Sequence, residues 1–349
     1  MKKFLAVATG VLLIGTCALT ACNKDKGNET DGEIKGQYTE VTTAELQEKL
    51  STLTPEKLFG DTSAKNWNFG VKLKADVDID ADIKTTVGEE KKTYLSGKID
   101  DETTLLARLT VADGETALGN FSIKARNNNK IKGELKKSEV LGIEEDIKFD
   151  YGINAYADDQ NLYFQLPDMK ELPVEIIPEG KYKVPIDFLA SYIAGFIPSA
   201  MTSVAETDKS DETADFLAEY GLKAAVDDSN GLKIKVSADK QTLYTVLEKT
   251  AGLQKTKVDE LVQLNKFAIN MYFEAAEDGA FEKAGLTVNI EGTLSIKAGD
   301  FDGLPALSGP VDIEADILVE KYDGEIIMPT AEELEEYQDL FGEDNGGNE

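Results

Sequence analysis

The chain has 349 residues, with 37 Lys and Arg against 66 Asp and Glu, which gives a net charge of −29. A hydrophobic fraction of 41% and a charged fraction of 30% are typical of a globular, water-facing protein and exclude a multispan membrane protein or a disordered chain. The absence of histidine from the sequence excludes Ser-His-Asp and Cys-His catalysis, histidine metal ligands and an imidazole pH switch. The negative charge argues against nucleic acid as a partner, because a phosphate-binding surface must be basic.

The first 21 residues contain the parts of an export signal. Lys2 and Lys3 precede an apolar run over residues 4–19 that is too short to span a membrane comfortably. The run ends in Leu19-Thr20-Ala21-Cys22, which resembles the bacterial lipobox. The resemblance implies cleavage just before Cys22 and attachment of a diacylglyceryl group to its sulfur. The alternative is an ordinary signal peptide in which the cysteine is incidental.

The expected organisation is a lipoprotein signal peptide (1–21), a flexible acylated tether (22–40), one α+β domain (41–341) and a disordered tail (342–349). The tether is polar and rich in glycine, so it has little to bury. Two acyl chains on Cys22 give stable attachment, at about 0.8 kcal/mol per buried methylene. We therefore expect a protein on the extracytoplasmic face of a bacterial membrane, with the membrane as its partner through the lipid anchor.

Alternation of apolar and polar residues with a period of two dominates the predicted domain. It is longest over residues 67–83, where Asp76, Asp78, Asp80 and Asp82 lie between apolar residues. A strand of this length is expected to bend. The pattern returns over residues 121–125, 147–153, 162–166, 232–236, 267–273, 286–296 and 311–319. Polar segments at 127–129, 158–161 and 228–231 predict tight turns and antiparallel pairing.

Two capping boxes mark the ends of the domain. Thr42 and Glu45 precede a predicted helix over 43–53, and Thr330 and Glu333 begin a predicted helix that runs to residue 341. Between the strands, helical spacing predicts further short helices near residues 216–220, 243–252 and 258–264.

A mid-chain helix over residues 187–197 is expected to carry one apolar stripe. Its members are Phe188, Tyr192, Phe196 and Ile197. The stripe has two interpretations, because it can line a pocket for an acyl chain or pack as a dry core helix that closes the sheet. These four residues are the predicted ligand-binding residues.

The predicted fold class is α+β, with a strongly curved antiparallel sheet, a half-barrel, whose concave face is covered by helices inserted in mid-chain. This order of elements resembles the lipoprotein-carrier half-barrels of the LolA, LolB and LppX type, in layout only, over about residues 42–337. In that family the concave face holds lipid acyl chains. The resemblance implies that the helix at 187–197 lies over that face.

Acidic residues suggest two other kinds of site. The segment from Asp78 to Glu89 has the length of an EF-hand-like calcium loop, but Ile83 stands where the loop needs glycine, and the alternation favours a solvated strand face. Paired carboxylates can hydrolyse glycosides without histidine, but no acidic residue has a recognisable catalytic context. Glycine-rich phosphate loops are absent from the sequence. We therefore expect no enzyme activity, no cofactor and no metal.

The expected function is that of a membrane-anchored extracytoplasmic lipoprotein that binds an apolar or amphipathic, lipid-like ligand on the concave face of its sheet. The alternative is a non-enzymatic structural or interaction lipoprotein of the cell envelope, with a fully packed core. A solute-binding protein of a transporter is disfavoured, because the chain lacks the alternating βαβ rhythm of such proteins.

Overall fold

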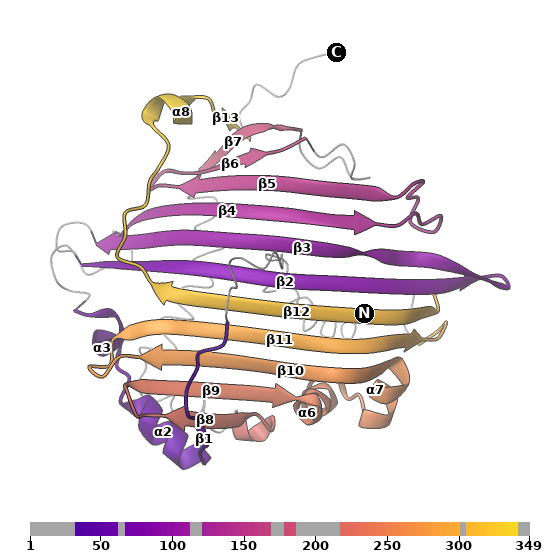
Figure 1. The fold of residues 1–349 in the computed structure, drawn as a ribbon, viewed down its shortest axis with the longest axis horizontal. Helices are drawn as coiled ribbons and strands as arrows, with labels where there is room; N and C mark the ends of the chain where they lie inside the picture. The colour runs from indigo at the N-terminus through magenta and orange to yellow at the C-terminus, as the bar shows by residue number, and fades with distance from the viewer. Residues whose placement is uncertain are drawn as a thin grey trace.

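The computed structural model describes residues 32–61, 67–111, 121–168, 178–185, 217–300 and 305–340. Within this part of the chain, the strands form one large open sheet accompanied by few helices (Figure 1). The predicted α+β fold is therefore confirmed in part: the large antiparallel sheet is present, but the described chain is mostly β and its helices are few. From one edge to the other, the strands are β1 (Thr39–Glu40), β8 (Lys223–Asp227), β9 (Leu232–Asp239), β10 (Val262–Ala275), β11 (Phe281–Ile296), β12 (Leu307–Lys321), β2 (Asn68–Val87), β3 (Glu90–Val111), β4 (Phe121–Leu135), β5 (Ile147–Ala157), β6 (Asn161–Leu166), β7 (Gly180–Pro185) and β13 (Gln338–Asp339).

The sheet is built from two sequence-ordered halves that meet at β2 and β12. Strands β2 to β7 follow one another on one side, strands β8 to β12 do so on the other, and β12 pairs antiparallel with β2. All neighbouring pairs are antiparallel except β7 and β13. The pairing of β12 with β2 joins the halves into one continuous sheet.

The long strand predicted at 67–83 is confirmed and extends to Val87. Its odd-numbered side chains face one side of the sheet, where Ala75 and Val77 are each 1% exposed. They form a buried cluster with Val288 of β11 and Ala315 of β12. The aspartates between them face the other side, as the alternation predicts.

The first predicted turn, at residues 127–129, is wrong. These residues lie inside β4 and pair with both β3 and β5. The Asn129 amide donates hydrogen bonds to Asp101 and Thr103 of β3, so an asparagine that favours a turn in isolation has partners within the sheet. Strand β3 itself was not predicted. The turns expected at 158–161 and 228–231 do connect β5 to β6 and β8 to β9.

The described helices are short and lie at the ends of the sheet. They are α2 (Thr43–Ser51), α3 (Pro55–Phe59), α6 (Lys240–Ala251), α7 (Lys255–Leu261) and α8 (Ala331–Glu335). Both predicted capping boxes are present at α2 and α8. Helix α8 ends earlier than predicted, because Gln338 and Asp339 pair with the edge strand β7 instead. The helix predicted at 187–197 lies outside the described residues.

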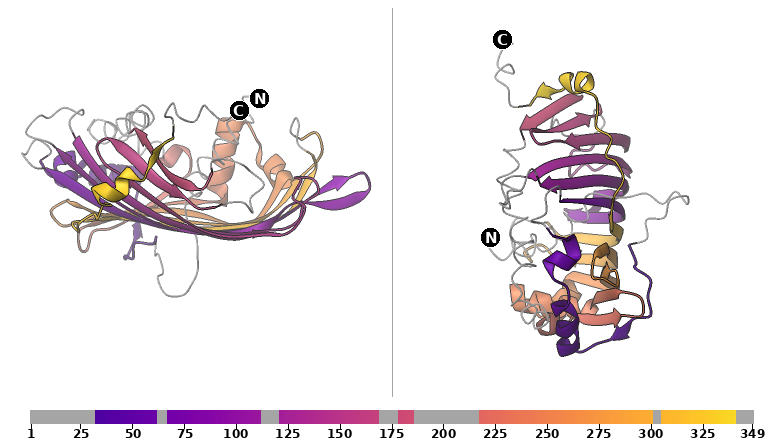
Figure 2. Two further views of the ribbon diagram at one scale, coloured as in Figure 1. Left: turned by 90° about the horizontal axis from the view of Figure 1, so that it is seen from above. Right: turned by 90° about the vertical axis from the view of Figure 1, so that its left-hand side faces the viewer.

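The sheet is bent, and α6 and α7 lie on its concave side (Figure 2). Helix α6 packs on β9 and β10, and α7 packs on β10 and β11. Two chain segments, 32–38 and 322–330, cross the opposite, convex side (Figures 1 and 2). The apolar face that carries Val77 is therefore the concave one, because Tyr272, which faces the other way, contacts Tyr38 of the first segment with ring centroids 6.2 Å apart.

The sequence predicts that residues 32–40 belong to a flexible tether, but residues 32–38 lie along the convex side and Thr39–Glu40 form β1 at the edge of the sheet. The Gln37 N–H donates to the Asp227 carboxylate at 2.8 Å, and Ile34 is buried. The backbones of Gly32 and Gly285 approach so closely that a Cβ on Gly285 would lie 2.1 Å from the Gly32 carbonyl oxygen. The part of the expected tether that is described is thus fixed to the sheet.

The register of β2 generates the first testable prediction. Val77→Asp would bury a charge among apolar neighbours and should lower the free energy of unfolding by about 3–5 kcal/mol. Asp78→Lys, on the adjacent convex position, should not destabilise the protein, because it replaces one of two facing acids, Asp78 and Glu314. Urea unfolding of both variants measures this, and equal losses at the two positions would contradict the assigned faces.

Candidate functional site

The residues predicted to carry function lie outside the described part of the chain. They are Cys22, Phe188, Tyr192, Phe196 and Ile197. The candidate site is built instead from the concave face of the sheet, the surface to which the predicted ligand was assigned.

Apolar side chains cross the concave face in rows that run perpendicular to the strands. One row follows directly opposed residues from β10 to β5 and consists of Ile269, Val288, Ala315, Val77, Asp101, Ile131 and Tyr151. The next row contains Met271, Leu286, Ile317, Ala75, Thr103, Asn129 and Ile153. Both rows are apolar from β10 to β2 and become polar at β3. Along these two rows the concave face is thus apolar except for one group of polar residues on β3 and β4.

This group, the polar cluster, consists of Asp101, Thr103 and Asn129. Asp101 is 5% exposed, although its neighbours in the row are Val77 and Ile131. The Asn129 side-chain N–H group donates to the Asp101 carboxylate and, at 2.8 Å, to the Thr103 hydroxyl. Burial raises the pKa of Asp101 to about 6, and the hydrogen bonds from Asn129 and Thr103 oppose that rise.

Sequence reasoning missed the polar cluster, although a signal was present. Asp101 and Thr103 occupy positions that continue the alternation of Ile99 and Leu105, so two polar residues stand where a half-buried strand has apolar ones. Asn129 belongs to the segment that was interpreted as a turn. These three residues explain why the sequence does not predict β3 and why it predicts a turn within β4. They also form the polar part of the site.

Aromatic side chains pack where β2 begins, beside α3. The Trp67 indole N–H donates to the Phe59 carbonyl oxygen at 2.7 Å, which ties α3 to the start of β2. The Phe69 ring contacts the rings of Phe59 and Phe281, with centroids 5.1 and 5.9 Å apart. These contacts hold α3 against β2 and β11.

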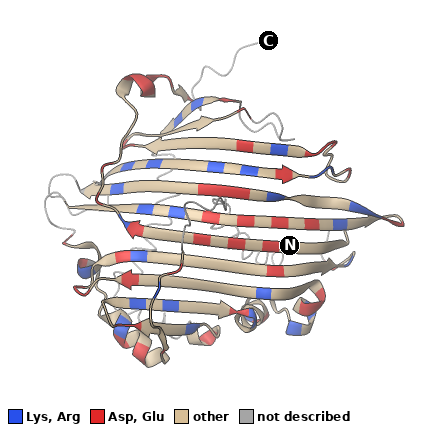
Figure 3. Cartoon of the chain, viewed as in Figure 1, with Lys and Arg blue, Asp and Glu red and all other residues tan. Residues whose placement is uncertain are grey.

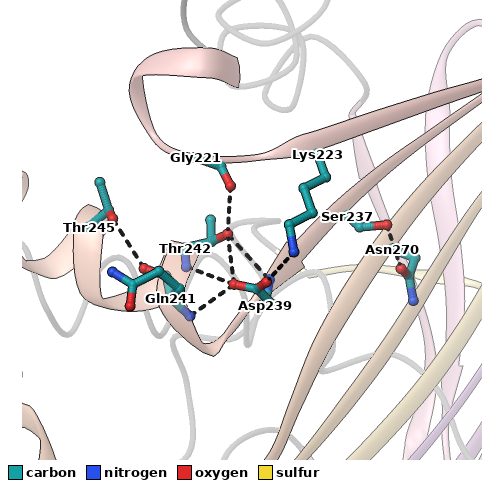
Figure 4. Close-up of polar contacts among 8 residues, drawn as sticks. All are labelled: Gly221, Lys223, Ser237, Asp239, Gln241, Thr242, Thr245 and Asn270. Carbon is teal, nitrogen blue, oxygen red and sulfur yellow. Dashed lines mark hydrogen bonds and ion pairs between the residues drawn. The ribbon is translucent and has the colours of Figure 1, made fainter. Parts of the chain in front are cut away.

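Helix α6 is held in place by the carboxylate of Asp239, the last residue of β9 (Figure 4). This carboxylate accepts hydrogen bonds from the backbone N–H groups of Gln241 and Thr242 at 2.9 and 3.1 Å, and it pairs with Lys223 at 2.8 Å. The Thr242 hydroxyl donates to the Gly221 carbonyl oxygen. Strand β9 therefore passes directly into a capped helix, which fixes the position of α6 relative to the sheet.

A solvent-open cleft of about 650 Å³ lies beside α6 and α7. At its wall the Tyr244 hydroxyl donates to the Asp259 carboxylate. The ammonium groups of Lys240 and Lys255 lie 5.6 and 5.1 Å from the centroid of the Tyr244 ring. These contacts join the two helices by hydrogen bonding and cation–π attraction.

Acidic residues are concentrated on β12, β2 and β3 (Figure 3). The alternation along these strands places most of them on the convex face. On these strands, acidic residues lie directly opposite one another, and we call this arrangement the acidic ladder. Its pairs are Asp76–Asp316, Asp78–Glu314, Asp80–Asp312, Asp76–Glu102 and Asp78–Asp100. Like charges opposite one another destabilise a sheet. Burial and the nearby Glu314, Glu291 and Asp80 carboxylates raise the pKa of Asp312. Within the described ranges, no three acidic side chains are arranged to hold a metal ion.

Comparisons with known proteins do not identify a family. No protein-family model matches the chain, and no match is found among curated proteins. Solved structures that are similar include the translocator domain of the autotransporter NalP from Neisseria meningitidis, at 6% identity and a TM-score of 0.15, covering 80% of this chain and 96% of that one. The Salmonella SPI-1 type III secretion secretin InvG matches at 10% identity and a TM-score of 0.13, covering 78% of this chain and 69% of that one.

No helix among the described residues is long and apolar enough to cross a membrane.

The acidic ladder generates a prediction about pH and salt. Because the folded state raises the pKa of Asp312, its ionised form opposes folding, so this carboxyl contributes stability at low pH that is lost as the pH rises through its folded pKa. Asp312→Asn should therefore raise the melting temperature at pH 7 in low salt, and added salt should shrink the gain.

The matched control is Asp150→Asn, which removes the same charge opposite Lys132 on the same convex face. Thermal unfolding at two salt concentrations measures both variants. An equal gain in melting temperature for both variants would show that net charge, and not the ladder, causes the effect.

Proposed function

We propose that this protein is a membrane-anchored extracytoplasmic lipoprotein that holds the apolar part of an amphipathic, lipid-like ligand on the concave face of its sheet. The observation that carries the proposal is Met271, a large apolar side chain on that face that is 43% exposed. It lies in an apolar row beside Leu286 and Ile317. An exposed apolar side chain that extends a buried apolar surface is what an apolar ligand would cover.

The extent of the concave face supports the same proposal. The apolar part of each row crosses four strands, from β10 to β2, while α6 and α7 pack only on β9, β10 and β11. The finer fold that we infer is a half-barrel in which the mid-chain helix at 187–197 lies over the remaining surface. Phe188, Tyr192, Phe196 and Ile197 would then contact the ligand from above the sheet.

The anchor would hold this surface close to the membrane. The described chain begins at Gly32 on the convex side, so a lipidated Cys22 would leave a linker that reaches at most about 35 Å. The bent sheet would therefore stand near the lipid surface from which a lipid-like ligand enters. Both the lipid anchor and the extracytoplasmic location are parts of this proposal, supported by the signal and lipobox resemblance of residues 1–22.

A second candidate is a structural or interaction role in the cell envelope, without a ligand. The acidic ladder favours it, because a dense row of carboxylates on the convex face is suited to a basic partner surface. In that case the apolar rows would be ordinary core packing. The two candidates differ in whether purified protein takes up an apolar molecule.

Met271→Glu tests the binding face. Because Met271 is exposed, the change should alter the free energy of unfolding by less than about 1 kcal/mol, yet it should weaken binding of the neutral apolar dye Nile red at least tenfold. The control is Asn128→Glu, which adds the same charge at an exposed position on the convex side of β4. Fluorescence titration of both variants and the wild type measures the effect.

Absence of dye binding to the wild type, together with no lipid in an organic extract of the purified protein, would contradict ligand binding and favour the structural role. Equal binding by Met271→Glu and the wild type would show that the dye occupies another surface.

Cys22→Ser tests the anchor. Removing the thiol should abolish incorporation of labelled fatty acid and leave the precursor uncleaved or release the protein from the membrane fraction. Fractionation and fatty-acid labelling of cells that express each form measure this. A variant that stays acylated and membrane-bound to the wild-type extent would disprove the lipobox interpretation.

A further inference from the structure

The first part of β10, residues 262–267, has an open edge. Strand β9 pairs with β10 only from Ala268 to Ala275, although β10 begins at Val262. Beyond Asp239 the chain enters α6 instead of continuing beside β10 (Figure 1). On this side, no described strand pairs with the open edge. An unpaired strand edge presents backbone N–H and C=O groups with which another extended chain can pair.

The solvent-open cleft beside α6 and α7 lies along this edge. Its volume of about 650 Å³ is within the usual range for ligand clefts, about 300–1,000 Å³. Its walls include Lys240, Tyr244 and Lys255 of the two helices and Asn265, Lys266 and Phe267 of the open edge. The cleft therefore gives a ligand access to both the strand edge and the helices.

One backbone group of the open edge already takes a donor from the helix side. The Lys240 ammonium group donates to the Leu264 carbonyl oxygen at 3.3 Å. This carbonyl group is therefore directed away from β11 and towards α6. A backbone N–H of an added strand can replace the ammonium group at this acceptor, which would leave Lys240 free to bind a carboxylate.

The two carboxylates that line the cleft already have partners. Asp239 accepts hydrogen bonds from the first turn of α6 and pairs with Lys223. Asp259 accepts from the Tyr244 hydroxyl and lies 3.7 Å from the Lys240 ammonium group. The acidic residues of the cleft are thus occupied by groups of the protein itself.

Basic side chains outnumber these carboxylates, although the chain has a net charge of −29. Lys255 is exposed and contacts the Tyr244 ring, and it forms no ion pair with any described acidic residue. Lys266 directly opposes Glu291, so its charge is partly compensated. At physiological ionic strength, charges more than about 8 Å away are largely screened. Lys240 and Lys255 therefore determine which charge the cleft attracts.

We propose that the cleft binds an extended, acidic peptide segment of a partner protein, which pairs with the open edge of β10 as an additional strand. An edge of six residues is about 20 Å long, so a short segment can pair along all of it. Main-chain hydrogen bonds would hold the segment, and its carboxylates would pair with Lys240 and Lys255. This surface is separate from the apolar rows to which the proposed function assigns its ligand.

The probe is a fluorescein-labelled peptide of about eight alternating threonine and glutamate residues, long enough to span the open edge. Fluorescence anisotropy measures its binding to the full-length protein. One control peptide replaces every glutamate with lysine. A second keeps every charge but has proline in place of a central threonine, which removes a backbone donor and disrupts strand pairing. The wild type should bind both control peptides about tenfold more weakly than the acidic peptide.

Lys255→Glu tests the contribution of the lysines. Lys255 is the first residue of α7, where an acidic side chain interacts favourably with the helix dipole, so the variant should fold. It should bind the acidic peptide about tenfold more weakly than the wild type and should bind Nile red equally well.

The matched control is Lys137→Glu. It makes the same change at an exposed lysine in the segment between β4 and β5, on the other side of the sheet. Because this position is remote from β10, the affinity for the acidic peptide should stay within about twofold of the wild type.

Equal binding of the acidic peptides with and without proline would overturn strand pairing and the proposal with it. Equal losses in Lys255→Glu and Lys137→Glu would overturn it too, because net charge alone would then attract the peptide. If no peptide binds the wild type, the proposal fails and Lys240 only protects the edge. Phosphatidylglycerol vesicles and size-exclusion chromatography would then show whether a lipid surface or a second copy occupies the cleft. Nile red binding tests the proposed function independently of all these outcomes.

Discussion

The burial of Val77 between Asp101 of β3 and Ala315 of β12 is the constraint on which the two faces of the sheet depend. Side chains alternate strictly along a strand, so a slip of one residue would move the whole apolar set to the convex face. With Val77 inside, Asp78 and its alternating partners must point outwards. The acidic ladder and the apolar rows are therefore two consequences of one register.

That register persists although it sets like charges against each other. Complete burial of an aliphatic side chain contributes about 1.5–3 kcal/mol, whereas a directly opposed surface pair changes stability by about 0.2–1 kcal/mol. The rows around Ala75 and Val77 contain several such apolar side chains, so packing on the concave face outweighs repulsion on the convex one. Burial, together with the neighbouring carboxylates of the ladder, raises the pKa values of Asp100 and Asp312.

Two of the errors of sequence reasoning lie on neighbouring strands and share a cause. Strand β3 was missed because Asp101 and Thr103 interrupt its alternation, and residues 127–129 were interpreted as a turn because three asparagines in isolation favour one. In the sheet, Asn129 instead satisfies Asp101 and Thr103. Local rules fail most often where a fold carries a special demand, and this failure coincides with the polar cluster of the concave face.

The sequence by itself determined the features that depend on near neighbours along the chain. These are the capped starts of α2 and α8, the turns at 158–161 and 228–231, and the length and faces of β2, because a cap, a turn and a period of two each involve a few adjacent residues. Only the tertiary structure decided that β12 pairs with β2, that residues 32–38 lie along the convex side, and that Asp101 is buried. Such contacts join residues as far apart as Arg108 and Tyr322, 214 positions along the chain. Their free energy comes from packing and hydrogen bonds between strands, which no short segment contains.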